Sequence, residues 1–76
     1  MELPREIEQK VAEMFPLYEK PDQPTYAMKV RFRNLAAELL LKQREASSQA
    51  AKRSLAEALT LLETASMFAV KALHQG

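Results

Sequence analysis

A tyrosine and two cations stand at helical spacing in the second quarter of the sequence. Tyr26, Lys29 and Arg33 are separated by three and four residues, so in a helix they share one face with Val30, whereas Arg31 points elsewhere. An aromatic ring beside two fixed cations suits a nucleotide-like anion, because the ring stacks on a base and the cations form charge-assisted bonds with phosphate. The same pattern also describes a solvated basic helix face with a tyrosine at its edge.

Two further residues could join such a site. Arg53 stands near the start of the last long helical stretch, where the helix dipole favours an acid. Its guanidinium therefore either has no special role or marks an anion site beside the N-terminal amides. Tyr18 lies in a proline-rich stretch, where it either closes over a ligand or packs on the helices.

The sequence contains no recognisable catalytic or metal-binding pattern. It has no cysteine and one histidine, His74, which suits the dipole at a helix C-terminus. No glycine-rich phosphate loop or nucleophile motif is present, and three carboxylates form no paired-acid pattern: Glu38, Glu57 and Glu63. We therefore predict a protein that is not an enzyme and uses no cofactor or metal.

Charge and hydropathy restrict the partners. The 11 basic and 10 acidic residues give a net charge of +1, which argues against a protein that coats nucleic acid. Glu38 and Glu63 interrupt the two longest apolar stretches, and a membrane-spanning helix needs about 20 apolar residues. The first residues resemble no signal peptide. We expect a soluble, intracellular protein without a membrane partner.

Apolar periodicity predicts one all-α domain over residues 1–76. The first helix should cover about residues 4–15, with one apolar face formed by Ile7, Val11, Met14 and Phe15. Pro16 ends this helix. Three prolines within residues 16–24 then make the following connection stiff and irregular.

The second helix should run from about residue 23 to residue 45. Asp22 is the expected N-cap, and Pro24 suits the first turn. The core stripe is predicted to contain Met28, Phe32, Leu35 and Leu39, widened by Leu40 and Leu41. A break at residues 46–48, capped by Ser47 or Ser48, should precede the third helix at about residues 48–74, although a continuous helix also fits. With the break, the two long helices form an antiparallel hairpin.

The third helix has more apolar surface than one neighbouring helix covers. Its central stripe consists of Leu55, Ala58, Leu59, Leu62, Ala65, Ala69 and Leu73. Leu61, Phe68 and Ala72 widen it on one flank and Val70 on the other, giving an arc of roughly 200°. Either this helix is central in a three-helix bundle, or copies of the chain pack through it. A core this small supplies only about 3–5 kcal/mol, so we favour a homo-oligomeric helical bundle.

The same stretch resembles a known family. Arg53-Ser54-Leu55-Ala56, followed by Leu62-Glu63-x-Ala65-x-Met67-Phe68-Ala69-Val70-Lys71-Ala72-Leu73, is similar to the second helix of small phage helical-hairpin proteins, which include the anti-CBASS sponges. Their usual pattern is Arg-Ser-x-Ala-Leu-x-x-Leu-Glu-x-Ala-x-Met-Trp-Ala and a small apolar tail. The similarity is good over residues 53–73 and loose over 18–52. Phe68 replaces a common tryptophan, and residues 56–59 carry extra positions.

The resemblance implies a function. Such proteins are not enzymes. They form homo-oligomers, from dimers to hexamers, and bind cyclic di- or trinucleotides between protomers. They act in the cytoplasm of an infected bacterial cell. Sequestering this messenger blocks CBASS anti-phage immunity. An aromatic residue stacks on a base while lysine and arginine hold the phosphates. By this resemblance Tyr18 or Tyr26 would stack, and Lys29, Arg33 and Arg53 would contact phosphate; only Arg53 lies in the well-matched stretch.

Two other functions remain open from the sequence. A helical interaction module would bind a host or phage protein through the wide apolar arc of the third helix. A small nucleic-acid-binding regulator would use Lys29, Arg31 and Arg33, although the balanced charge and the lack of a helix-turn-helix spacing argue against it.

Overall fold

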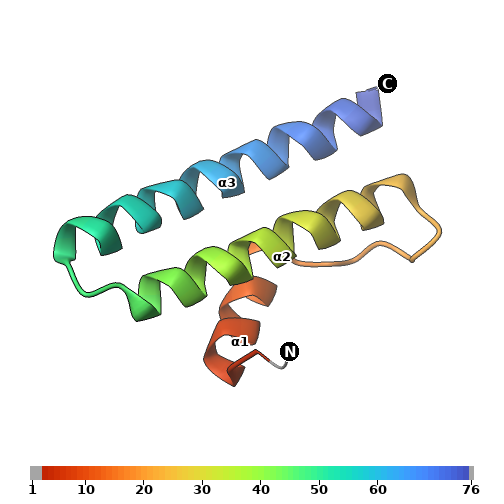
Figure 1. Cartoon of the computed structure of the whole chain (residues 1–76). Coiled ribbons are helices and arrows are strands. Elements are labelled where there is room, and N and C mark those ends of the chain that lie inside the picture. The colour runs from red at the N-terminus through yellow and green to blue at the C-terminus, as the bar shows by residue number, and fades with distance from the viewer. Residues whose placement is uncertain (1–2, 76) are drawn as a thin grey trace.

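The computed structural model of the chain, which describes residues 3–75, is built of three helices. They are α1 (Arg5–Met14), α2 (Pro24–Glu45) and α3 (Gln49–Gln75), and no strand occurs within residues 3–75. The predicted all-α character is thus confirmed, and each helix begins and ends within one residue of the expected position. Figure 1 shows α2 and α3 running antiparallel as a hairpin, with α1 on the other side of α2. The molecule is elongated, with principal extents of 42 × 24 × 16 Å.

α2, rather than α3, is the central helix. It makes the main contacts with both other helices, and α1 packs on α2 (Figure 1). Small residues permit this double contact, because Ala36 is fully buried and Ala37 nearly so. The interpretation of α3 as the centre of a three-helix bundle is therefore wrong. α1 lies mainly against α2, so it adds little cover to the apolar surface of α3.

The core forms where α1 meets the hairpin. Ile7, Val11 and Phe15 of the α1 face are buried, as the periodicity predicts. The Phe15 ring stacks on that of Phe32, with centroids 6.4 Å apart. The remaining members of the buried cluster come from the two long helices: Ala36, Ala37, Leu40 and Leu59. Phe32, Leu39 and Leu41 pack around them, whereas Leu35, which we placed in the core stripe, is exposed.

Two caps were predicted, and one is correct. The Ser48 side chain accepts a hydrogen bond from the Ala51 N–H at 3.0 Å, so a serine does start α3. At α2 the N-cap is Gln23 and not Asp22. The Gln23 side chain instead accepts from the Lys20 N–H at 2.9 Å, while the Gln23 N–H donates to the Lys20 carbonyl at 3.0 Å. This reciprocal turn sets how the chain enters α2.

The central stripe of α3 and the flank formed by Leu61 and Phe68 differ in how far they are buried. Leu59 and Ser66 are buried against the hairpin partner, and the Ser66 hydroxyl is satisfied by the Glu63 carbonyl at 2.7 Å. Leu61 and Phe68 remain 69% and 65% exposed. Ala65 and Leu73, expected in the central stripe, are exposed as well. No helix described between residues 3 and 75 is both long and apolar enough to cross a membrane.

Candidate functional site

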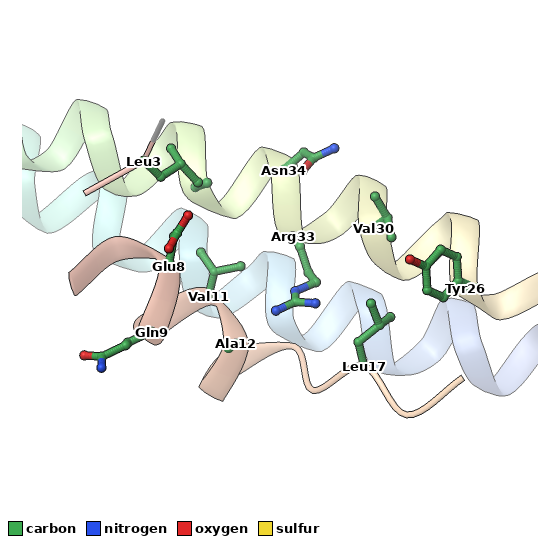
Figure 2. Close-up of a pocket in the computed structure, with 11 residues that line it drawn as sticks. Leu3, Glu8, Gln9, Val11, Ala12, Leu17, Tyr26, Val30, Arg33 and Asn34 are labelled. Carbon is green, nitrogen blue, oxygen red and sulfur yellow. The ribbon is translucent and has the colours of Figure 1, made fainter. Parts of the chain in front are cut away.

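A groove runs between α1, the connecting segment (residues 15–23) and α2. Its volume is about 550 Å³, which lies within the usual range of small-molecule sites, roughly 300–1,000 Å³. Figure 2 shows Tyr26, Val30 and Arg33 along the α2 wall, with Leu17 opposite. The other lining residues are Leu3, Glu8, Gln9, Val11, Ala12, Asn34 and Ala37. Tyr26 and Arg33 are thus brought together in one hollow.

Arg33 is the principal cation of this groove. Its side chain is half-buried and projects from α2 toward Val11 and Leu17 (Figure 2). The described residues form two ion pairs, Lys29 with Glu19 and Arg44 with Glu6, and Arg33 belongs to neither. A guanidinium offers five N–H donors in a fixed fork, so Arg33 is available to bind an anion bidentately.

The groove carries opposite charges at different places. Glu8 of α1 lies at the end next to Leu3, whereas Tyr26 lies at the opposite end, with Arg33 between them (Figure 2). A phosphate would be repelled near Glu8 and attracted near Arg33. A ligand that fits therefore places its anionic group at the half of the groove bounded by Arg33 and Tyr26, and uncharged or donor groups toward Glu8.

Lys29 does not line the groove. Its Nζ lies 2.8 Å from each carboxylate oxygen of Glu19, and both side chains are largely shielded, at 20% and 14% exposure. The hydrogen bond from Lys29 lowers the pKa of the Glu19 carboxyl below its ordinary value; burial opposes this shift, while the Lys29 charge, the Tyr18 backbone and the Thr25 hydroxyl add to it. The Lys29 charge is thus already neutralised within the chain.

The connecting segment separates Lys29 from the other two predicted residues. Pro16 lines a smaller apolar hollow of about 290 Å³ with Phe15 and Lys29, and α3 contributes Ser66, Met67 and Val70 to it. The next residue, Leu17, lines the groove that holds Tyr26 and Arg33. A shared helix face therefore does not give a shared site here, because a third piece of chain lies across that face.

The two remaining predicted residues lie apart from the groove. Tyr18 is 85% exposed on the connecting segment. Arg53 is exposed on α3 and lines a shallow hollow with Ala56, Glu57, Thr60 and Leu61 of the same helix. Within one chain, neither side chain lines the hollow that contains Tyr26 and Arg33.

Sequence reasoning missed Glu8, Leu17 and Glu19. Glu8 and Leu17 enter the groove through the packing of α1 and the connecting segment on α2, which no local spacing encodes. Glu19 is ten residues from Lys29 across two prolines, so helical periodicity does not connect them. The one available signal was that the stiff segment, which carries the acids Glu19 and Asp22, precedes a helix with an excess of cations.

The described residues contain no group of three or more His, Asp or Glu side chains placed to hold a metal ion. Comparison of the chain with protein-family models, with curated proteins and with solved structures gave no match.

Proposed function

We propose that this protein is a phage-encoded sponge that binds cyclic di- or trinucleotides and sequesters them without hydrolysis, so that CBASS immunity is not activated. The observation that carries the proposal is Arg33, a half-buried guanidinium outside both ion pairs of the described chain, beside Tyr26 in a groove of ligand size. The resemblance of residues 53–73 to phage helical-hairpin proteins supplies the identity of the ligand.

In this proposal Tyr26 stacks on a base and Arg33 holds phosphate. Both interactions are strong when partly shielded from water: base stacking on an aromatic ring contributes about 1–3 kcal/mol, and a hydrogen bond to a charged group about 1.5–3 kcal/mol. Arg53 and Tyr18 reach a ligand only if a neighbouring copy presents them. Assembly would therefore complete the site, and repeated cations around a symmetry axis would strengthen the binding of a small dianion.

The exposed flank of α3 supports association of copies. Leu61 and Phe68 leave large apolar side chains in water, and Leu35 of α2 is exposed as well. The hollow beside Leu35 is lined by Met28, Arg31, Phe32, Leu35 and Ala69. Surfaces of this kind mark protein interfaces.

Calorimetry with a panel of cyclic di- and trinucleotides tests the proposal. We expect heat of binding and full recovery of the intact nucleotide. Arg33→Ala and Tyr26→Ala should each weaken binding by at least about tenfold, since 1.4 kcal/mol corresponds to one decade. The matched control is Lys42→Ala, which removes an exposed cation of the same helix outside the groove and outside the exposed apolar hollow.

Two results would overturn the proposed sponge function. One is the absence of heat with every nucleotide in the panel. The other is equal binding by the Arg33→Ala and Lys42→Ala variants, which would place the ligand elsewhere. In cells, expression of the protein should let a CBASS-sensitive phage replicate, and the Arg33→Ala variant should lose this effect.

A helical module that binds another protein is the second candidate. It is favoured by the exposure of Leu61 and Phe68 and requires no ligand in the groove. It predicts a monomer or loose dimer that binds an apolar dye and gives no heat of binding with the cyclic nucleotides. A nucleic-acid regulator fits the geometry less well, because Lys29 is neutralised by Glu19 while Arg31 and Arg33 line different hollows.

A further inference from the structure

The connecting segment forms walls of two hollows, yet it has few regular contacts of its own. Residues 15–23 form neither helix nor strand. Their described backbone hydrogen bonds lie at the two ends of the segment, from Phe15 to Val11 and within the Lys20–Gln23 turn. Between these ends lie Leu17, which bounds the groove, and Tyr18, which is exposed. Something else must hold the middle of the segment on α2.

The Glu19–Lys29 ion pair is placed to do so. It joins the middle of the segment to the second turn of α2, with 2.8 Å from Nζ to each carboxylate oxygen. Both side chains are mostly shielded, so solvent screens their interaction less than it would an exposed pair. Glu19 is also two residues from Leu17, so releasing the carboxylate releases the wall of the groove.

We infer that Lys29 is a positioning residue: through Glu19 it latches the connecting segment onto α2 and so forms the groove wall at Leu17, instead of contacting the ligand itself. The functional part of this inference rests on the proposed function. The latch itself is a property of the chain and is testable with no ligand present.

Limited proteolysis with chymotrypsin tests the latch. The enzyme cleaves after aromatic residues, and Tyr18 is exposed beside Glu19, whereas Phe15 is followed by Pro16 and is not a usable site. Cleavage within a folded protein requires local opening, and its rate follows the population of the opened state. We expect Glu19→Gln and Lys29→Met to accelerate cleavage after Tyr18 on the order of tenfold, because a charge-assisted bond is lost.

Three controls separate the latch from general destabilisation. Cleavage after Phe68 in α3 reports global unfolding within the same digest and should not change. Lys29→Arg keeps a cation that binds a carboxylate bidentately and should preserve the protection of Tyr18. Glu6→Gln breaks the exposed Glu6–Arg44 pair and should leave the segment unaffected. If Glu19→Gln and Lys29→Met are cleaved after Tyr18 at the wild-type rate, the latch does not exist.

Ligand affinity then distinguishes positioning from direct contact. If Lys29 positions the wall, Glu19→Gln weakens binding of the cyclic nucleotide on the order of tenfold. If Lys29 is instead a phosphate ligand masked by Glu19, the same substitution unmasks its charge and tightens binding, which would overturn the inference. Absence of nucleotide binding in the wild type would refute the proposed function, and the proteolysis would still decide whether the latch exists.

Discussion

The two sides of the α2–α3 hairpin differ in how their apolar residues are covered. On one side, α1 and the connecting segment bury Ile7, Val11 and Phe15 against the hairpin. Away from α1, Leu35, Leu61 and Phe68 remain exposed in the described part of the chain. Both sides are apolar in sequence, so composition does not decide which is buried. The decisive factor is that α1 is the one further helix in residues 3–75, and the stiff connecting segment places it on only one side of the hairpin.

This contrast is tested most strongly by removing one phenylalanine from each side. Phe15 is 4% exposed and stacks on Phe32, so Phe15→Ala should lower the free energy of unfolding by about 3–5 kcal/mol, close to the whole stability expected for a core of this size. Phe68→Ala should change the free energy of unfolding of the monomeric chain by less than about 0.5 kcal/mol. Urea titrations followed by circular dichroism measure both. Equal losses would mean that the exposed side is also part of the core.

Association of copies should depend on the exposed side. Leu61→Glu places a charge there and should shift the assembly toward monomer by at least about tenfold in dissociation constant, because an unpaired charge at an apolar interface is unfavourable. Met67→Glu is the matched control: Met67 is as exposed as Leu61 but lines the hollow on the covered side. Sedimentation analysis reports the masses. A wild-type chain that stays monomeric at micromolar concentration would contradict the prediction.

The covered side should show a pH dependence that originates at Glu19. The pKa of Glu19 is lowered in the folded chain, so its ionised form stabilises the fold above the pKa of the unfolded chain, about 4.3. This contribution is lost as the pH falls through the lower, folded pKa. Wild type should therefore exceed Glu19→Gln in stability at neutral pH, and the difference should shrink on acidification. Urea midpoints at a series of pH values check this; a difference independent of pH would exclude ionisation of Glu19 as the cause.

The smallest effect is expected at the rim of the covered side. Arg44 and Glu6 join α2 to α1 at 3.4 Å, with both side chains mostly in solvent. Exposed pairs of this kind contribute about 0–1 kcal/mol and are weakened by salt. Glu6→Gln should therefore move the urea midpoint little and lose even that effect in high salt. A loss of stability comparable with that of Glu19→Gln would mean that the shielded ion pair contributes no more to stability than the exposed one.

The sequence was sufficient to predict the helices but not their packing. Periodicity, Pro16 and the serines at residues 47–48 located three helices with accurate bounds, because these signals act within a few residues. The central place of α2 was missed: it depends on how α1 folds back over a nine-residue connection, which has no period. The N-cap was also missed, since Gln23 competes with Asp22 through a turn of its own.

The candidate site was predicted in part for the same reason. Tyr26 and Arg33 are two helical turns apart and do line one groove. Lys29 has the expected helical position, but its side chain is paired with Glu19, a residue from a segment without regular structure. Arg53 and Tyr18 lie outside the groove, so their part in a site stays a prediction that concerns neighbouring copies.

The chain contains no tryptophan and two tyrosines, one exposed on the connecting segment and one half-buried in the groove. Near-ultraviolet absorption and emission therefore arise mainly from these two rings. Replacing Tyr18 by phenylalanine leaves Tyr26 as the sole tyrosine, so the molecule carries a built-in optical reporter of whatever enters the groove, without any dye or label.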